Sequence, residues 1–236
     1  MEYFGRKDLT TKDTIDAVNT YRLVLNNLLS NIFVNGLNSR ELTLIGFCYK
    51  KLGNYKKAIS FFEKAVLVDK TNFSAFYEMG ICAFKENKNC IALNSFINAI
   101  QAKPDNLSAI LNLGISHELC EEDDMALMIY ERLIETNPEY KNGYLYKAEL
   151  LIKFSRYNDA IEVLRQGIEY NPNSVELYSR LGFCYKMLGK NESAYQSYKK
   201  VLKSDAPNKI SLNAIKEMRK IRKNNDKKLK FVICNA

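Results

Sequence analysis

A fixed spacing of 34 residues runs through residues 39–208 and divides them into five consecutive repeat units. The clearest sign is an alanine that recurs at this spacing, at Ala58, Ala92, Ala126, Ala160 and Ala194. Twelve residues before each alanine stands a small residue, which is glycine in four units and alanine in the other. A period of this length is typical of a solenoid, in which each unit buries its apolar face against its neighbours. The chain is therefore expected to form an elongated array rather than a compact fold around one centre.

Each unit holds two segments in which apolar residues recur at helical spacing. In the first unit Gly53 separates the segments, and the apolar residues are Leu42, Ile45 and Tyr49 before it and Tyr55, Ala58, Phe62 and Ala65 after it. Such spacing places these residues on one face of each helix. Three units close with a proline, which ends a helix because it lacks the backbone donor; these are Pro104, Pro138 and Pro172. The pattern predicts two packed helices per unit.

These residues and their spacing resemble the tetratricopeptide repeat family. The resemblance covers five complete units, which are 39–72, 73–106, 107–140, 141–174 and 175–208. It implies an all-α fold, a right-handed superhelical solenoid of antiparallel helix pairs. In this family the first helices of successive units line a concave groove, and the arrays usually present a surface for other proteins.

The fourth unit departs most from the shared pattern. It has Lys147-Ala148 where the other units have a large apolar residue followed by glycine. It also has Gly167 where a small helix former is expected. We therefore expect this unit to be the least regular of the five.

Two predicted helices flank the repeats. Residues 1–38 carry an apolar stripe from about Thr11 to Val34, and residues 209–224 form an amphipathic helix whose other side is basic. Both are predicted to cap the open apolar faces of the terminal repeats. The apolar stretch 229–234 is too short to span a membrane and is expected to fold back on the last helix or to extend freely. In a second interpretation, one of these ends fills the groove when no ligand is bound.

Cysteine usage and the lack of long apolar runs favour a cytoplasmic protein. No run approaches the roughly 18 apolar residues of a transmembrane helix, and charges interrupt the first residues before any signal-like apolar core. Cys48, Cys82 and Cys184 share one repeat position, where a small apolar side chain suits the contact between helices. Because no Cys-x-x-Cys pair or cysteine–histidine cluster exists, neither a metal site nor a cofactor is expected. His117, the single histidine, is interpreted as a packing residue, and no catalytic motif indicates an enzyme.

The net charge of +8 is concentrated at one end of the chain. Residues 209–236 carry nine basic and two acidic side chains, whereas the third unit carries eight acidic side chains against Arg132. We interpret the basic residues first as the solvated face of a capping helix. The alternative is a patch that contacts nucleic acid or another anionic surface, formed by Lys216, Arg219, Lys220, Arg222 and Lys223.

The predicted groove is built from residues one turn away from the helix-pair contact of each first helix. Most are apolar, and the lysines line the rim. The candidate residues are Phe47, Lys50, Tyr77, Ile81, Phe84, Lys85, Leu111, Ile115, Leu119, Leu145, Ile152 and Phe183. A contiguous apolar surface of this kind usually binds a partner, although some of these side chains could equally be core.

Two known uses of such arrays are not favoured here. Arrays that grip chaperone C-terminal tails need a lysine and an asparagine on one first helix, and the candidate pairs are Thr43/Phe47, Tyr77/Ile81, Leu111/Ile115 and Leu145/Glu149. The asparagine ladder of sugar-transferase arrays is reduced to Asn112. The leading hypothesis is a non-enzymatic adaptor or chaperone that binds an apolar or amphipathic peptide. The alternatives are nucleic-acid or anionic-surface binding through the basic helix, and self-assembly through the end helices.

Overall fold

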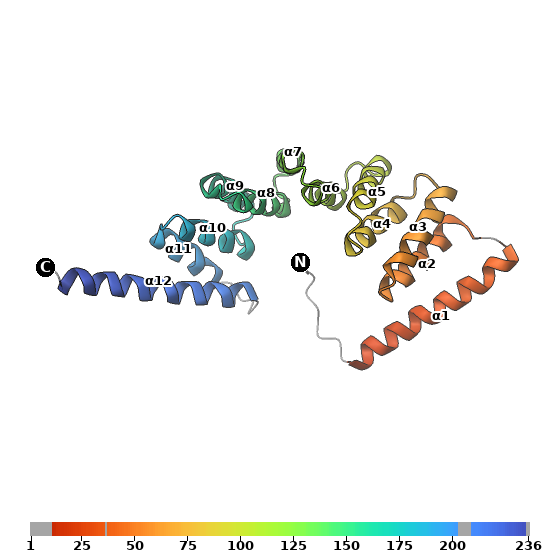
Figure 1. Cartoon of the computed structure of the whole chain (residues 1–236), viewed down its shortest axis with the longest axis horizontal. Helices are drawn as coiled ribbons and strands as arrows, with labels where there is room; N and C mark the ends of the chain where they lie inside the picture. Colours follow the sequence, from red (N-terminus) through yellow and green to blue (C-terminus); the bar gives the residue numbers. More distant parts are fainter. Residues whose placement is uncertain (1–10, 36, 203–208, 235–236) are drawn as a thin grey trace. The chain divides into compact units, whose positions relative to one another are not determined.

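The computed structural model describes residues 11–35, 37–202 and 209–234, and this part of the chain consists of α-helices joined by turns (Figure 1). The side chains of the two end helices are described at 16–30 and at 212–224 and 226. The helices are α1 (Thr11–Asn35), α2 (Ser39–Lys51), α3 (Tyr55–Val68), α4 (Phe73–Lys85), α5 (Asn89–Ala102), α6 (Leu107–Leu119), α7 (Asp123–Thr136), α8 (Lys141–Lys153), α9 (Tyr157–Tyr170), α10 (Val175–Met187), α11 (Asn191–Leu202) and α12 (Lys209–Cys234). The protein is an all-α repeat solenoid.

Each 34-residue range holds two helices joined by a tight turn. The turn contains a residue with a positive φ angle that recurs at the repeat spacing, at Gly53 (φ 78°), Asn87 (54°), Glu121 (62°), Ser155 (59°) and Gly189 (71°). This left-handed conformation ends the first helix and turns the chain back. Only two of the five residues are glycines, so the position in the repeat, and not the residue type, determines this backbone conformation.

Side chains in the residue before each first helix help to start it. The side-chain oxygens of Asn38, Asn72, Asn106 and Ser174 accept hydrogen bonds from backbone amides three residues later. These N-caps satisfy backbone donors that the helix itself leaves unpaired. Tyr140 occupies the same repeat position before α8 and makes no side-chain cap.

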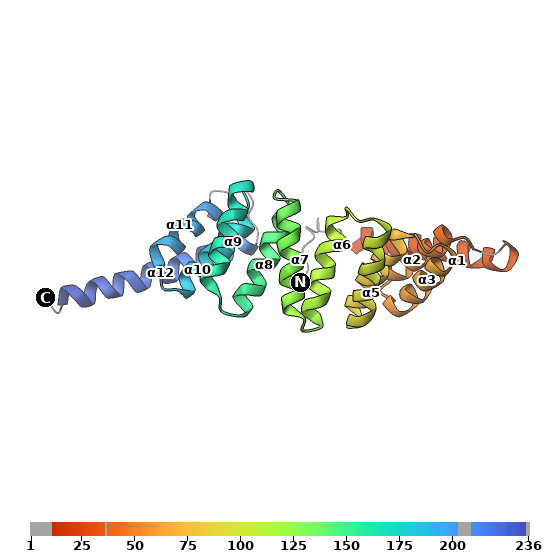
Figure 2. The same ribbon diagram turned by 90° about the horizontal axis from the view of Figure 1, so that it is seen from above.

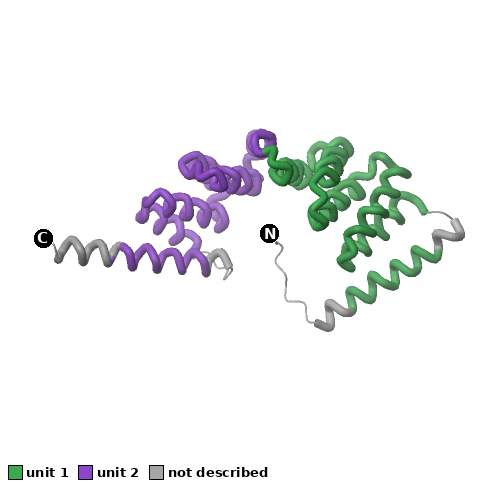
Figure 3. The backbone as a smooth tube through the Cα atoms, viewed as in Figure 1, with its two compact units in different colours: residues 1–122 green, residues 123–236 purple. Residues whose placement is uncertain are grey.

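The chain divides into two compact units, residues 1–122 and 123–236 (Figure 3). Unit 1 contains α1 to α6, and unit 2 contains α7 to α12. The division falls inside the third repeat, between its two helices. Within unit 1, α6 packs on α5, and within unit 2, α7 packs on α8.

In unit 1, glycines on the first helices let aromatic rings of the second helices approach the backbone. A Cβ atom added at Gly46 would lie 2.6 Å from the Phe62 ring, and one at Gly80 would lie 2.6 Å from the Phe96 ring. Both rings are fully buried. In these two repeats the glycine is therefore required by the aromatic ring that packs against it.

In unit 2 the fifth repeat uses the same device, because a Cβ at Gly182 would lie 2.6 Å from the Tyr198 ring. The fourth repeat differs in its side-chain packing, but its helices α8 and α9 have the same lengths as α4 and α5 of the second repeat. The expected irregularity is therefore absent from its helix lengths. Gly167 is explained by Tyr144, whose Cγ would lie 2.7 Å from an added Cβ.

The end helices pack against the terminal repeats. In unit 1, Leu25 of α1 is buried in a cluster with Ile45 and Cys48 of α2. In unit 2, Ala214 and Ile221 of α12 are buried in a cluster that includes residues of α11. Figure 2 shows α1 and α12 from a second direction. Both end helices thus contact the neighbouring repeats through apolar side chains.

The predicted end of the last helix at residue 224 was wrong, because α12 continues to Cys234. The stretch 229–234 is thus part of the helix rather than a separate tail. No glycine or proline interrupts residues 209–234, and lysine and leucine favour helix, so nothing in the sequence stops it earlier. Within the described residues, no helix is both long and apolar enough to cross a membrane.

Candidate functional site

In unit 1 the predicted groove residues lie on α2, α4 and α6. Phe47, Tyr77, Ile81, Phe84 and Ile115 are half-buried, so each contacts the core and keeps part of its surface open. Leu119 is 46% exposed, and Lys85 is exposed as well. Leu111, by contrast, is only 6% exposed and lies in the core of the unit.

The apolar side chains of α4 rest on the buried core. The rings of Tyr77 and Phe84 lie 5.8 Å and 5.2 Å from the ring of Phe96, measured between centroids. Phe96 belongs to α5 and is fully buried. The half-buried rings of α4 are therefore held by their inner edges, which limits their movement and gives the surface a defined shape.

Phe47, the first residue of the predicted groove, already has neighbours. Its ring meets the ring of Tyr21 of α1 edge-on at 6.3 Å. The Nζ atoms of Lys50 and Lys51 lie 5.5 Å and 5.1 Å from its centroid, within cation–π distance. The N-terminal helix therefore contacts one end of the predicted groove through Tyr21.

Polar residues of the first helices bond across neighbouring repeats of unit 1. Lys50 of α2 forms an ion pair with Glu78 of α4. The amide of Asn112 donates to the Tyr77 hydroxyl at 3.2 Å. These contacts pair polar groups that could otherwise bind a polar ligand. The apolar side chains therefore remain as the accessible part of the surface.

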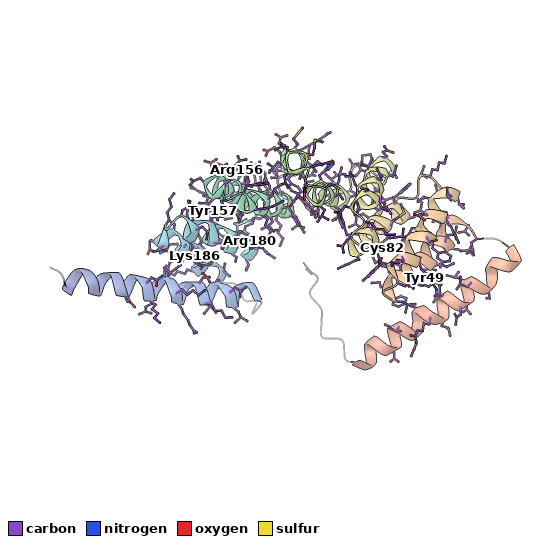
Figure 4. The ribbon with its side chains drawn as sticks, viewed as in Figure 1. Tyr49, Cys82, Arg156, Tyr157, Arg180 and Lys186 are labelled. Carbon is purple, nitrogen blue, oxygen red and sulfur yellow. The ribbon has the colours of Figure 1, made fainter. Side chains whose placement is uncertain are left out.

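The remaining predicted groove residues lie in unit 2. Leu145, Ile152 and Phe183 are half-buried on α8 and α10. Two ion pairs join α10 to other helices of unit 2, Arg180 with Glu149 of α8 at 2.5 Å and Lys186 with Glu217 of α12. Arg180 and Lys186 both extend from α10 (Figure 4).

Sequence reasoning missed an open cleft in unit 2. It has a volume of about 560 Å³ and is lined by residues of α7, α8 and α9. Lys147 lies in it, at the repeat position that holds Ile45, Met79, Leu113 or Leu181 elsewhere. Lys147 pairs with Glu131 of α7, while burial and the nearby Arg156 lower its pKa. A lysine at a repeat position that is otherwise apolar was the sequence signal for this cleft. The cleft itself could be recognised only from the way the neighbouring helices pack.

The predicted basic patch lies on one accessible side of α12. All five of its residues are exposed, from Lys216 to Lys223. The acidic residue among them, Glu217, contacts Lys186 and Lys220, which lower the pKa of its carboxyl. The patch is therefore positively charged at neutral pH.

Three of the cysteines are buried, and the histidine pairs with a carboxylate. Cys48, Cys82 and Cys184 are buried, and burial raises the pKa of the Cys82 and Cys184 thiols to about 12. Such thiols are protonated and poor nucleophiles at neutral pH. The His117 side chain is 12% exposed, and its Nδ1 lies 2.5 Å from a carboxylate oxygen of Glu122. Among the described residues, no group of three metal-binding side chains occurs.

Known proteins share both the repeat pattern and the fold. Tetratricopeptide repeat models match residues 39–72 and 175–208, and a further TPR repeat model matches residues 148–189. The solved structure of YrrB, a TPR protein with an unusual peptide-binding site, superposes with a TM-score of 0.57 at 18% identity. That superposition covers 80% of this chain and 97% of YrrB.

Curated relatives share the repeats over part of their length. The UDP-N-acetylglucosamine–peptide N-acetylglucosaminyltransferase of Giardia intestinalis is 26% identical over 60% of this chain and 10% of its own. The Hsp70-Hsp90 organising protein of Plasmodium falciparum is 32% identical over 44% of this chain and 20% of its own. The chain thus spans a fifth or less of either protein, and the likeness is one of repeats. With three repeat matches and the solenoid fold, the chain belongs to the tetratricopeptide repeat family.

Proposed function

We propose that the protein is a non-enzymatic scaffold that binds an apolar or amphipathic peptide along the first helices of unit 1. The observation that carries this proposal is the set of half-open apolar side chains on α2, α4 and α6. They come in addition to a complete buried core, so the packing of the repeats does not require their outer surfaces. Partly open apolar surface of this kind is typical of binding sites.

The polar contacts of unit 1 support an apolar rather than a charged ligand. Lys50, one of the two lysines in the predicted groove, is already paired with Glu78. The positions that would grip a chaperone tail hold Phe47 and Ile81. The likeness to the Hsp70-Hsp90 organising protein therefore does not extend to a carboxylate clamp. Peptide binding on the same fold in YrrB is in keeping with the proposal.

The expected affinity is modest. Burying two or three apolar anchors contributes roughly 1.5–3 kcal/mol each. Ordering of the peptide and loss of its free movement offset much of this gain, so dissociation constants on the order of micromolar are expected.

The test starts from peptides selected by the full chain from a random phage-displayed library. Their affinities are then measured by fluorescence polarisation for the wild type and two variants. Leu119→Glu and Phe84→Ala should each weaken binding about tenfold, or about 1.4 kcal/mol. Leu111 is unsuitable because a charge there would enter the core.

Leu67→Glu provides the matched control. Leu67 is 76% exposed on α3, a second helix of the same unit, so the same apolar-to-acidic change occurs outside the predicted surface. The control should bind as the wild type does. Equal affinity of all variants for the selected peptides would rule out the proposed surface.

The exposed cations of α12 support a second candidate function, binding to nucleic acid or another polyanion. A phosphate-driven contact weakens steeply as salt is raised, whereas apolar peptide binding hardly responds. Binding of single-stranded RNA is therefore measured at two salt concentrations for the wild type and for Arg219→Glu with Lys223→Glu. Absence of binding at low salt would remove this candidate.

A further inference from the structure

The cleft of unit 2 lies between two acidic helices. Helix α7 carries four acidic residues and one basic residue, a net charge of −3, and α9 carries three acidic residues and one basic residue, a net charge of −2. Arg156, which precedes α9, is paired with Asp159 at 2.6 Å. Glu162 lines the cleft and forms no ion pair with the described part of the chain. The charged side chains that line the cleft are Glu131, Asp159 and Glu162 against Lys147 and Arg156, a net charge of −1, so the unpaired Glu162 favours a cationic partner.

The cleft also offers apolar contacts. Leu127, Leu151 and Val163 contribute side chains from α7, α8 and α9. Met128, which lines the cleft on α7, is 66% exposed, although it is large and apolar. An apolar lining with acidic walls fits an amphipathic helix that carries lysines beside its apolar stripe.

The C-terminal end of α12 has this chemistry. Residues 227–234 include Lys227, Lys228 and Lys230, and Leu229, Val232 and Ile233 share one helical face by their spacing. Within 209–236, nine basic residues oppose two acidic ones, a net charge of +7 against the −3 of α7, α8 and α9 together. Electrostatic complementarity and apolar spacing thus point to the same segment.

This segment cannot reach the cleft of its own chain. Helix α12 is continuous over 26 residues, about 39 Å at 1.5 Å per residue. Its residues Ala214 and Ile221 hold it against the end of unit 2 formed by α10 and α11. The described part of α12 runs away from α7 in both views (Figures 1 and 2).

We propose that the cleft formed by α7, α8 and α9 binds the C-terminal end of α12, residues 227–234, from a second copy of this chain. The contact is head-to-tail, because the two copies use different surfaces. Contacts of this kind leave one free cleft and one free helix end on every dimer, so assembly continues beyond two copies unless it closes into a ring. The proposal concerns unit 2 and does not depend on peptide binding in unit 1.

Sedimentation velocity of the full chain at low salt tests the proposal with two variants. The helix-end variant carries Val232→Asp and Ile233→Asp, and the cleft variant carries Met128→Lys and Glu162→Lys. The wild type should form dimers and larger species above about 10 μM, and raised salt should weaken them. Each variant alone should remain monomeric, with circular dichroism showing that its helices are retained.

Mixing the two variants gives the decisive result. The intact helix end of the cleft variant should enter the intact cleft of the helix-end variant, so the mixture should form a 1:1 dimer and nothing larger. A control variant with Glu63→Lys and Leu67→Lys makes similar changes at exposed positions of α3 and should assemble like the wild type.

Three results would overturn the proposal. The first is a wild type that remains monomeric at about 200 μM, a concentration at which even weak self-association is seen. The second is a cleft variant that still assembles alone, which would indicate contacts between two helix ends. The third is a mixture that stays monomeric although the wild type assembles, and this would assign the cleft to a partner other than a second copy.

Discussion

The second and fourth repeats have helices of the same lengths, but different residues fill the contact between them. In the second repeat, Gly80 of α4 lies against the Phe96 ring of α5. In the fourth repeat, Ala148 of α8 stands at the glycine position, and Leu164 of α9 replaces the aromatic ring. All four residues are buried. A larger residue on one helix is thus matched by a smaller one on its partner.

A second exchange runs in the same direction, with a larger residue on the first helix of the fourth repeat and a smaller one on its second helix. The second repeat pairs Phe76 with Ala99, whereas the fourth pairs Tyr144 with Gly167. The Tyr144 ring lies so close to Gly167 that no Cβ fits between them. In the fourth repeat, each larger residue on the first helix is therefore matched by a smaller residue on the second helix. The two repeats thus preserve the combined side-chain volume at the contact between their helices, although the residue at each single position differs.

The largest expected effect comes from placing the alanine of the fourth repeat into the second. Gly80→Ala would put a Cβ atom 2.6 Å from the Phe96 ring, so the ring or the helix must shift. Overpacking of this kind costs about 3 kcal/mol of unfolding free energy. Urea unfolding of the full chain, followed by circular dichroism, measures it.

The paired variant decides whether compensation is the cause. Gly80→Ala with Phe96→Leu reproduces the Ala148 and Leu164 pair and should recover about half of the lost stability. If the two changes destabilise additively, the pairs are not equivalent and the comparison between the repeats fails.

Gly167→Ala tests the second exchange and should cost about 2 kcal/mol, because the new Cβ would lie 2.7 Å from Cγ of Tyr144. Tyr144→Leu in the same chain recreates the Leu42 and Ala65 pair of the first repeat and should relieve the clash. Tyr144→Phe is an independent control. The buried Tyr144 hydroxyl has no hydrogen-bond partner among the described residues, so its removal should leave stability unchanged or raise it.

Lys147→Met makes the fourth repeat like the second, which has Met79 at this position. Burial and Arg156 lower the pKa of Lys147, so the charged lysine destabilises the folded state. The variant should therefore be more stable than the wild type by about 1 kcal/mol at neutral pH.

The pH dependence of this difference follows from the lowered pKa. Below the folded-state pKa both states bind the proton, and the penalty is fully present. As the pH rises from there toward the ordinary lysine value, the folded state loses its proton first, and wild-type stability rises. The advantage of Lys147→Met should then shrink between neutral pH and about pH 10.5. An advantage that is constant across this range would show that charge burial is not its cause.

Much of the fold could be predicted from the sequence, because the repeat period places equivalent residues at equivalent contacts. The buried position of Cys48, Cys82 and Cys184 follows from that period. The continuation of α12 beyond residue 224 does not follow from the repeat period. It lies outside the repeats, and a run of helix-forming residues without a glycine or proline does not show where the helix ends. Compensation between Tyr144 and Gly167 was also missed, because each departs from the pattern alone and only their contact joins them.

The candidate sites were harder to predict than the fold. Repeat positions indicate which side chains lie away from the helix-pair contact, but they do not show how much surface a neighbouring helix covers. Leu111 illustrates this, since it shares the repeat position of half-open Tyr77 and is itself buried. The cleft around Lys147 depends on three helices at once and has no local sequence motif.

The smallest expected effect concerns the turns of the two repeats, where Asn87 and Ser155 both adopt left-handed backbone angles. Glycine takes this conformation without strain, whereas serine is strained by its Cβ and asparagine is less so. Ser155→Gly should therefore stabilise the chain by about 0.5–1 kcal/mol, and Asn87→Gly by less. Gly189→Ala, at the same position of the fifth repeat, should destabilise by about 1 kcal/mol. Urea midpoints of the three variants give the order, and an equal gain from Asn87→Gly and Ser155→Gly would mean that the asparagine side chain brings no relief to the turn.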